Sequence, residues 1–416
     1  MPSFVIISSG SEITGGRSLD TNAKWIANEL FLLGWQVQKF VVLPDDPNRI
    51  YSELNALLEN SKQEPTFVIM TGGLGPTEDD YTLETVLKLT DKKSYTVEKA
   101  KIRLLRIYES RGKKYEDIIP TVLRQIEVPE NSFVLDNSVG IASGFIESIG
   151  ANFGLACLPG VPREMTEMFS KRLVPELKRR FPRENLNIEI RWLWGIGESL
   201  FQSEFIENNR DIISKGIEWG VTANRGYIKV IFISKIKSIL DEILSKLNSK
   251  YSHIISEDVF QSVHSELIKQ KKTVAVGESC TSGLLGKKFT EFPGSSAYFL
   301  GGFLTYHNNL KVNLLGVKEE TIANFGAVSY ETAIEMVNGV HERAGSDFSI
   351  SITGIAGPEG GTKEKPVGTV WIGVKESGSG PIAEKFEFPG DRDTIRENAA
   401  NTAIHMLYKL LLKVEL

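Results

Sequence analysis

Residues 66–80 read TFVIMTGGLGPTEDD, an apolar run that passes into three glycines and ends in three acids, the last two of them aspartates. The first eight letters, TFVIMTGG, have the β-branched and apolar character of a buried strand. Two more strands are expected upstream, FVIISSG (4–10) and VQKFVVL (37–43), each followed by a helical pattern. Strand, helix, strand, helix and strand in this order predict a parallel, doubly wound α/β sheet.

Start signals support both helices. Asp20 or Thr21 can cap a helix over NAKWIANELFLLG, and DPNRIYSELNALLENS (46–61) opens with a proline in its first turn. A later strand, GLACLPG (154–160), ends in a Gly-x-Pro turn and adds to the same sheet. The N-terminal domain is therefore expected to span residues 1–172.

The glycines and acids after the strand at 66–73 lie where open α/β sheets bind ligands. Gly72, Gly73 and Gly75 let the backbone approach a phosphate and donate N–H groups to it. Asp79 and Asp80 supply adjacent oxygen ligands for a Mg²⁺-type ion that bridges a phosphate. A glycine-rich turn with solvated acids is the alternative, but a strand, three glycines and paired aspartates together favour phosphate chemistry. Neither a Walker A nor a G-x-G-x-x-G motif is present.

Composition limits the classes of function. With 416 residues the chain can form two or three domains, and its net charge of −5 argues against bulk nucleic-acid binding. Two cysteines give no disulfide framework. The N-terminus lacks the features of a signal peptide, and no apolar run reaches the roughly 20 residues that span a bilayer. A cytoplasmic protein without membrane contact is expected.

A small α+β module is expected at 173–257, because alternating runs at 188–194 and 227–234 surround two helical segments. Trp192 and Trp194 alternate with polar neighbours, so one is expected in the core and the other partly exposed.

The third region, 258–416, contains TVAVGESCTSGLL (273–285), where a strand stops at Gly277 and small polar residues precede a helix. Cys280 could be a nucleophile if a histidine lay nearby. Ser279 could be one too, because the N–H groups and positive partial charge of a helix N-terminus stabilise an oxyanion. A plain helix cap at Ser279 or Thr281 is the simplest interpretation of this segment alone.

Basic residues elsewhere in the third region favour catalysis. Lys311 follows Tyr306 by five residues, and a desolvated lysine can have a pKa low enough to deprotonate a serine. Arg392 and Arg396 lie in the first turns of the last helix, where a positive charge is unfavourable next to the helix dipole. Binding of an anionic ligand would explain why two arginines lie there. Glu278 could orient the serine turn or be a surface acid, and the surface acid is the favoured interpretation.

The segments GSEITGGRSLDTNAKWIA (10–27), TGGLGPTEDDYT (71–82) and LPGVPREM (158–165) resemble the N-terminal domain of the CinA (competence/damage-inducible) family. That domain is similar to molybdopterin-binding domains. The resemblance implies an ADP-ribose pyrophosphatase that depends on K⁺ and a divalent metal such as Mg²⁺, and a KH-like middle module. It implies that the nucleotide is held by Gly10, Asn22, Gly72, Gly73, Gly75 and Thr77, and the metal by Glu12, Asp79 and Asp80.

In the third region ESCTSG, GSSAYF, TYHNNLK, SITGIAGPEGG and FPGDRD resemble, in family order, the nicotinamide-nucleotide amidase domain of CinA proteins. The resemblance implies hydrolysis of nicotinamide mononucleotide (NMN) to nicotinate mononucleotide and ammonia, without a cofactor. Ser279 would be the nucleophile, Lys311 its base and Tyr306 an assisting group. Substrate would contact Thr281, Gly283, Ser296, Thr353, Gly354, Gly357 and Arg396. Ser282 replaces a glycine of the family, a change expected to be minor unless the position needs a positive φ.

These expectations combine into a bifunctional enzyme of pyridine-nucleotide salvage. One half would deamidate NMN, and the other would cleave ADP-ribose to AMP and ribose 5-phosphate. A homodimer is expected from the resemblance, with the middle module as spacer or dimerisation element. Two alternatives stay open: a non-enzymatic binding protein linked to competence or DNA damage, and a pterin-binding N-terminal domain.

Overall fold

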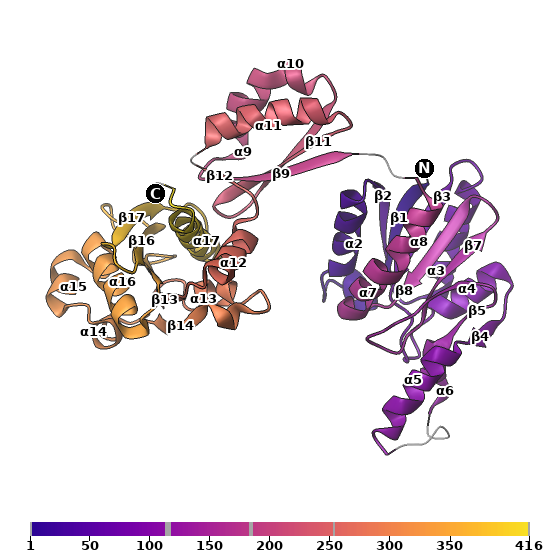
Figure 1. Cartoon of the computed structure of the whole chain (residues 1–416). Coiled ribbons are helices and arrows are strands. Elements are labelled where there is room, and N and C mark those ends of the chain that lie inside the picture. The colour runs from indigo at the N-terminus through magenta and orange to yellow at the C-terminus, as the bar shows by residue number, and fades with distance from the viewer. Residues whose placement is uncertain (1, 113–117, 183–185, 253, 415–416) are drawn as a thin grey trace. The chain divides into compact units, whose positions relative to one another are not determined.

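The computed structural model describes residues 2–112, 118–182, 186–252 and 254–414. The chain divides into two compact units, Met1–Asn185 and Leu186–Leu416, which are shown in Figure 1 and described separately below. Over the described residues, no helix combines the length and apolar character that crossing a membrane requires.

The first unit is built on a six-stranded sheet in the order β2-β1-β3-β8-β7-β6. Strands β2, β1, β3 and β8 are parallel, and β7 and β6 are antiparallel to their neighbours. Their bounds are β1 Ser3–Ser9, β2 Val37–Leu43, β3 Thr66–Thr71, β6 Phe133–Leu135, β7 Gly144–Ile149 and β8 Phe153–Leu158. The predicted doubly wound α/β domain is confirmed.

Helices cover both faces of this sheet. On β1, Phe4 and Ile6 enter one apolar cluster, whereas Val5 and Ile7 enter another on the opposite face. Both faces being buried explains why the strands read as continuous apolar runs. The first face carries α2 (Thr21–Leu32) and α7 (Pro162–Met168), and the second carries α3 (Pro47–Asn60) and α4 (Thr82–Thr90). Asp20 caps α2 through Ala23 N, as expected.

Shorter elements complete the first unit. They are α1 Ser11–Thr14, β4 Ser94–Thr96, α5 Glu98–Glu109, α6 Pro120–Leu123, the 3₁₀ turn Arg124–Ile126 and β5 Glu127–Pro129.

The predicted boundary after residue 172 lies inside a helical segment. A π-helical turn, Phe169–Leu173, runs directly into α8 (Val174–Arg180). Leu173 and Leu177 are fully buried in the same apolar cluster as β1. The first domain therefore continues past residue 172, and the first compact unit ends at Asn185.

The second unit begins with a small α+β module. Its antiparallel sheet has the order β10-β11-β9-β12, with bounds β9 Asn187–Trp194, β10 Ile217–Ala223, β11 Tyr227–Ser234 and β12 Ile255–Ser256. Its helical segments are α9 Glu198–Phe201, turns at Gln202–Ile206 and Glu207–Asn209, α10 Arg210–Ile213 and α11 Lys237–Tyr251.

Both tryptophans of β9 are buried, which corrects the expectation that one is partly exposed. Trp192 and Trp194 belong to an apolar cluster that also contains residues of the C-terminal region. The module's sheet therefore packs against that region rather than against solvent on this side.

The C-terminal region has a five-stranded sheet in the order β14-β13-β15-β16-β17. Strands β14, β13 and β15 are parallel, and β16 and β17 are antiparallel. The strands are β13 Val274–Glu278, β14 Phe299–Leu304, β15 Phe348–Gly354, β16 Thr369–Glu376 and β17 Ile382–Glu387. The helical elements are α12 Val259–Gln270, α13 Leu284–Phe289, a 3₁₀ turn Ser295–Ala297, α14 Asn308–Leu315, α15 Glu319–Phe325, α16 Tyr330–Ala344 and α17 Arg392–Leu411.

Candidate active sites

A serine and a lysine meet at the end of β13. The strand continues through Glu278, one residue past the predicted stop at Gly277, and Ser279 follows it directly. Lys311 lies on α14 and keeps only 1% of its surface exposed. Its Nζ lies 3.0 Å from Ser279 Oγ. The side chains predicted to act as nucleophile and base therefore share a hydrogen bond, although 32 residues separate them in the chain.

The surroundings of Lys311 favour its neutral form. Burial removes water from the ammonium group and lowers the Lys311 pKa to about 8. Its Nζ also donates to Thr305 O at 2.8 Å and, over a longer 3.4 Å, to Tyr306 O. A neutral amine has two N–H bonds and one lone pair. When both carbonyls accept those N–H bonds, the lone pair is left to face the Ser279 hydroxyl.

The neighbouring cysteine is poorly suited to act as the nucleophile. Cys280 is buried, and burial raises the pKa of its thiol to about 12. A thiol with that pKa holds its proton near neutral pH, and the thiolate is the reactive form. Ser279 is the better candidate of the two.

The second candidate site is a cavity in the first unit, at the carboxyl ends of β1 and β3. Its volume is about 340 Å³. The lining includes eight of the nine residues predicted for nucleotide or metal binding: Gly10, Glu12, Gly72, Gly73, Gly75, Thr77, Asp79 and Asp80. Gly10 and Glu12, which follow β1, therefore lie around the same cavity as the glycine-rich loop that follows β3.

Close backbone approaches explain two of its glycines. Gly72 has φ +98°, and a Cβ there would lie 2.3 Å from the Ser9 carbonyl oxygen. A Cβ on Gly75 would lie 2.5 Å from an Asp80 carboxylate oxygen. Asp80 in turn accepts hydrogen bonds from Thr77 N at 2.8 Å and Thr77 Oγ1 at 2.5 Å. The loop is therefore held in shape by its own glycines and by Asp80.

Full-length relatives identify the family. A "CinA-like protein" of Leptospira biflexa is 63% identical over 410 residues, which cover 99% of this chain and 98% of the relative. The chain belongs to the CinA family. A "CinA-like protein" of Leptospira interrogans is 47% identical, again over 99% of this chain and 98% of the relative.

Two family models match separate parts of the chain. The "CinA C-terminal domain" matches residues 256–411, and a "Probable molybdopterin binding domain" matches residues 5–179. The crystal structure of a competence/damage inducible protein from Agrobacterium tumefaciens has 37% identity and a TM-score of 0.36, and covers 37% of this chain and 96% of that one.

In this CinA-family chain, Glu278 is not the surface acid favoured from the sequence, and the alternative, a residue that orients the serine turn, is the one that the structure supports. It is 1% exposed, and its carboxylate accepts hydrogen bonds from the backbone N–H groups of Gly283, Leu285 and Gly286 at 2.8–3.1 Å. These groups belong to the start of α13. Glu278 therefore fixes the turn that carries Ser279, and it occupies the helix N-terminus that was expected to stabilise an oxyanion.

Ser282 is the second correction in this turn. Its φ is +49°, in the left-handed region that favours glycine. The replacement of the family's glycine is therefore not minor, because a serine in this region carries conformational strain. Gly283, next to it, has φ +93° and caps α13.

The predicted substrate contact Arg396 is engaged with the main chain. It donates from Nε to Cys280 O at 3.1 Å and from Nη2 to Thr281 O at 2.9 Å. These bonds tie α17 to the serine turn, so the role visible here is positioning. Thr281 itself is fully buried, and its Oγ1 has no hydrogen-bond partner within the described residues.

Tyr306 also differs from its expected geometry. Its side chain is exposed, and its hydroxyl accepts a hydrogen bond from Arg392 Nη2 at 3.1 Å. Arg392 Nη1 donates to Gly357 O at 2.7 Å. The hydrogen bond that Tyr306 accepts from Lys311 goes to its main-chain oxygen rather than to its hydroxyl. Arg392, which the resemblance did not assign, therefore links the Tyr306 segment to the loop around Gly357.

The other residues predicted to contact the amidase substrate differ in burial and in their hydrogen-bond partners. Thr353 is fully buried and donates to Ala327 O, and a Cβ on Gly354 would lie 3.1 Å from Cys280 Sγ. Gly354 therefore packs closely against the serine turn, whereas Thr353 is tied to the segment that precedes α16. Ser296 is exposed in a 3₁₀ turn, and no hydrogen bond in the described part of the chain joins it to Ser279 or Lys311. Its contact with substrate stays a prediction.

In the first unit Asn22 is the predicted residue outside the cavity lining. It donates to Gly160 O at 2.8 Å, and Gly160 does line the cavity. Asp45 and Glu164 line the cavity but were not predicted. Asp45 accepts hydrogen bonds from Ser9 Oγ and Ser11 N at 2.8 and 2.7 Å. Its position in PDDP, directly after β2, was a usable signal.

The acidic lining fits a metal that arrives with its substrate. Among the described residues, no group of three or more His, Cys, Asp or Glu side chains is arranged to hold a metal alone. Five carboxylates line the cavity, from Glu12, Asp45, Asp79, Asp80 and Glu164. Mg²⁺ is usually held by one or two carboxylates, waters and substrate phosphates rather than by a protein cage. The donor set is compatible with that mode of binding.

Proposed function

We propose that the chain hydrolyses NMN to nicotinate mononucleotide and ammonia at Ser279, and ADP-ribose to AMP and ribose 5-phosphate at the cavity of the first unit. The observation that carries the first activity is the 3.0 Å contact between the buried Lys311 amine and the Ser279 hydroxyl. A lysine with a pKa near 8 beside a serine is the arrangement of a base and a nucleophile for acyl transfer.

The deamidation cycle follows from this pair. Ser279 Oγ attacks the carboxamide carbon while Lys311 Nζ takes the hydroxyl proton. The C–N bond then breaks, and Lys311 returns that proton to the departing nitrogen, which leaves as ammonia. Water attacks the resulting ester, with Lys311 again as base, and releases the carboxylate product and Ser279.

The oxyanion of this cycle needs donors other than the start of α13. Glu278 already accepts from Gly283, Leu285 and Gly286, so those N–H groups are engaged. The remaining candidates are backbone N–H groups in the turn at 280–282, which Arg396 holds through two carbonyl oxygens.

The negative charge of the cavity lining supports a requirement for cations in the cleavage of ADP-ribose. Five carboxylates and, among the described lining residues, no Lys, Arg or His side chain face the cavity. A diphosphate would be repelled from such a site unless cations lay between the two sets of oxygens. Mg²⁺ and K⁺, when bound, would neutralise the phosphates and orient water. Asp79, Asp80 and Glu12 would hold the divalent ion, and the backbone at Gly72, Gly73 and Gly75 would approach the phosphates.

Separate incubations with NMN and ADP-ribose test both activities. The full chain should release ammonia and nicotinate mononucleotide from NMN equally well with and without EDTA. It should produce AMP and ribose 5-phosphate from ADP-ribose only when Mg²⁺ is added, and faster with K⁺. No ammonia from NMN would refute the first activity, and EDTA-resistant cleavage of ADP-ribose would refute the proposed metal role. The homodimer stays a prediction, which light scattering can check.

A further inference from the structure

Arg392 is an exposed arginine at the first position of α17, and it bridges two loops of the C-terminal region. Its Nη1 donates to Gly357 O at 2.7 Å, in the glycine-rich loop that follows β15. Its Nη2 donates to the Tyr306 hydroxyl at 3.1 Å, and the main-chain oxygen of the same tyrosine accepts a hydrogen bond from Lys311. The guanidinium therefore lies beside segments that surround the serine–lysine pair.

The next turn of α17 contacts the serine turn directly. Arg396, four residues after Arg392, donates to Cys280 O and Thr281 O. Residues four apart lie on one face of a helix and are displaced along its axis by about 6 Å. Arg392 is therefore about one helical turn away from the serine turn. In NMN the pyridine ring and the ribose separate the carboxamide from the phosphate, so a phosphate contact belongs at a distance from Ser279 rather than next to it.

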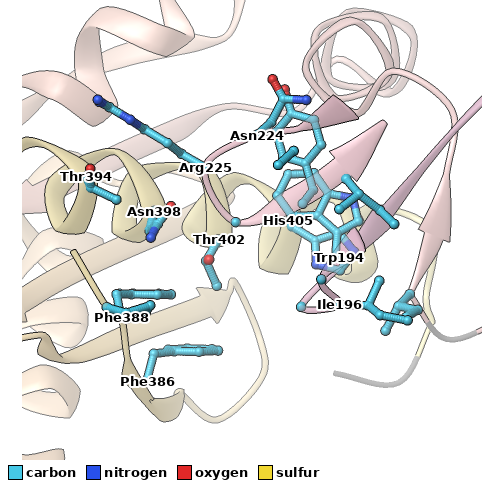
Figure 2. A pocket seen from close by; sticks show the side chains of 18 of the residues that line it. Trp194, Ile196, Asn224, Arg225, Phe386, Phe388, Thr394, Asn398, Thr402 and His405 are labelled. Carbon is cyan, nitrogen blue, oxygen red and sulfur yellow. The ribbon is translucent and has the colours of Figure 1, made fainter. Parts of the chain in front are cut away.

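A different side of α17 lines a cavity of about 630 Å³. Figure 2 shows Thr394, Asn398 and Thr402 of this helix among the side chains around that cavity. Neither Arg392 nor Arg396 occurs among the described residues that line it. The two arginines therefore belong to the side of the helix that contacts the amidase segments.

Arg392 retains donors for an anion. A guanidinium has five N–H groups, and the contacts with Gly357 and Tyr306 use two of them. Both acceptors are neutral oxygens, and in the described part of the chain no carboxylate forms an ion pair with Arg392. A positive charge at a helix N-terminus is unfavourable for the helix itself. Binding of an oxyanion, which accepts well from the N–H fork of an arginine, would offset that cost.

The two acids next to Arg392 in the sequence have other partners. Asp391 caps α17 and accepts a hydrogen bond from Thr394 N at 2.8 Å. The Asp393 carboxylate lies 3.6 Å from Arg396 Nη1. Neither acid therefore neutralises Arg392.

Two more charged side chains lie near this end of the helix. Arg225 of the small module donates to Asp393 O at 3.4 Å, and Figure 2 shows its guanidinium directed toward the start of α17. Arg225 lines the cavity, so it belongs to the other side of the helix. Glu359 follows Gly357 by two residues and is exposed, so water and salt screen its charge.

We propose that Arg392 binds the phosphate of NMN and thereby makes the amidase site select nucleotides over nucleosides. This inference rests on the proposed deamidation of NMN at Ser279. The phosphate accepts from N–H groups that Gly357 and Tyr306 leave unused. Arg396, the arginine that the resemblance assigned to substrate, holds the serine turn instead.

Nicotinamide riboside is the matched probe, because it is NMN without the phosphate. The affinities of both compounds are measured by calorimetry on the full chain with Ser279→Ala, which prevents turnover. NMN should bind about thirtyfold more tightly than the riboside, the value of charge-assisted hydrogen bonds to one phosphate. Adding Arg392→Gln should remove this preference and leave the affinity for the riboside unchanged. Arg392→Lys should keep part of the preference, since the charge remains, and Arg343→Gln, at an exposed position on α16, should keep all of it.

Three results would overturn the proposal. They are equal affinities for the two compounds in the Ser279→Ala chain, a preference for NMN that survives Arg392→Gln, and an equal loss of affinity for both compounds in Arg392→Gln. The last would show that Arg392 only ties the loop at Gly357 to Tyr306. Ammonia release by the unmodified chain reports on the proposed function separately. Phosphate-dependent binding without ammonia release would refute deamidation and support the phosphate site.

Discussion

Lys311 Nζ and Ser279 Oγ are 3.0 Å apart, and both side chains are more than nine-tenths buried. Water therefore competes little with either group, which is what lowers the lysine pKa to about 8. The amidase proposal rests on this contact.

The pH dependence of NMN hydrolysis should follow the deprotonation of Lys311. Lys311 acts as a base only when deprotonated, so kcat/KM should rise about tenfold per pH unit below pH 8 and level off above it. Lys311→Met should abolish ammonia release. Lys318→Met, at a nearby exposed position, is the control and should keep the pH profile of the unmodified chain. A rate independent of pH between 6 and 9 would contradict the role of Lys311.

Glu278→Gln should weaken the fold of the serine turn. The amide keeps only one acceptor oxygen and loses the charge, whereas the carboxylate now accepts from three N–H groups. We expect the free energy of unfolding, from urea titration, to fall by about 2 kcal/mol. Deamidation should slow at the same time. Glu291→Gln, an exposed acid in the same segment, is the control and should change neither quantity; equal behaviour of the two variants would show that Glu278 does not hold the turn.

Ser282→Gly should relieve the backbone strain at this position without destabilising the chain. At φ +49° a serine carries strain on the order of 1 kcal/mol that glycine avoids. The melting temperature should therefore rise or, if the added freedom of the unfolded chain offsets the gain, stay level. Ser379→Gly, whose φ is not positive, should lower it. A clear loss of stability in Ser282→Gly would mean that the serine side chain contributes more than its backbone strain costs.

Asp80→Ala should lower the rate of ADP-ribose cleavage by about a hundredfold or more and leave the rate of NMN hydrolysis unchanged. Asp80 holds Thr77 and lies against Gly75, so its loss disturbs both the proposed metal ligand and the loop. Glu78→Ala is the matched control, because Glu78 is an exposed acid of the same loop that does not line the cavity. Equal rates for Asp80→Ala and the unmodified chain would exclude Asp80 from the site.

Much of the fold could be predicted because strong local patterns coincide with the elements. The strands at 37–43 and 227–234 have the expected bounds, and Asp20 caps its helix. Strand β17 (Ile382–Glu387) was not predicted, because IAEKFE is half polar and lies at a sheet edge, where no continuous apolar run is required.

The sites were harder to predict at residues whose position and role depend on tertiary contacts. TGGLGPTEDD indicated the cavity of the first unit, but Glu164 reaches it from beyond β8, far along the chain. Glu278 resembled a surface acid, since only the course of the turn to α13 brings three N–H groups to its carboxylate. Likewise the positive φ of Ser282 depends on where α13 starts, which the letters CTSGLL leave open.

Comparing Ser279→Ala with Cys280→Ala in the release of ammonia from NMN tests the central claim most directly. Deleting the hydroxyl beside Lys311 should reduce the rate by about a thousandfold or more, with the melting curve unchanged. Deleting the buried thiol should leave most of the activity. Ammonia release by Ser279→Ala at the rate of the unmodified chain, or its loss in Cys280→Ala alone, would contradict the assignment of Ser279 as nucleophile.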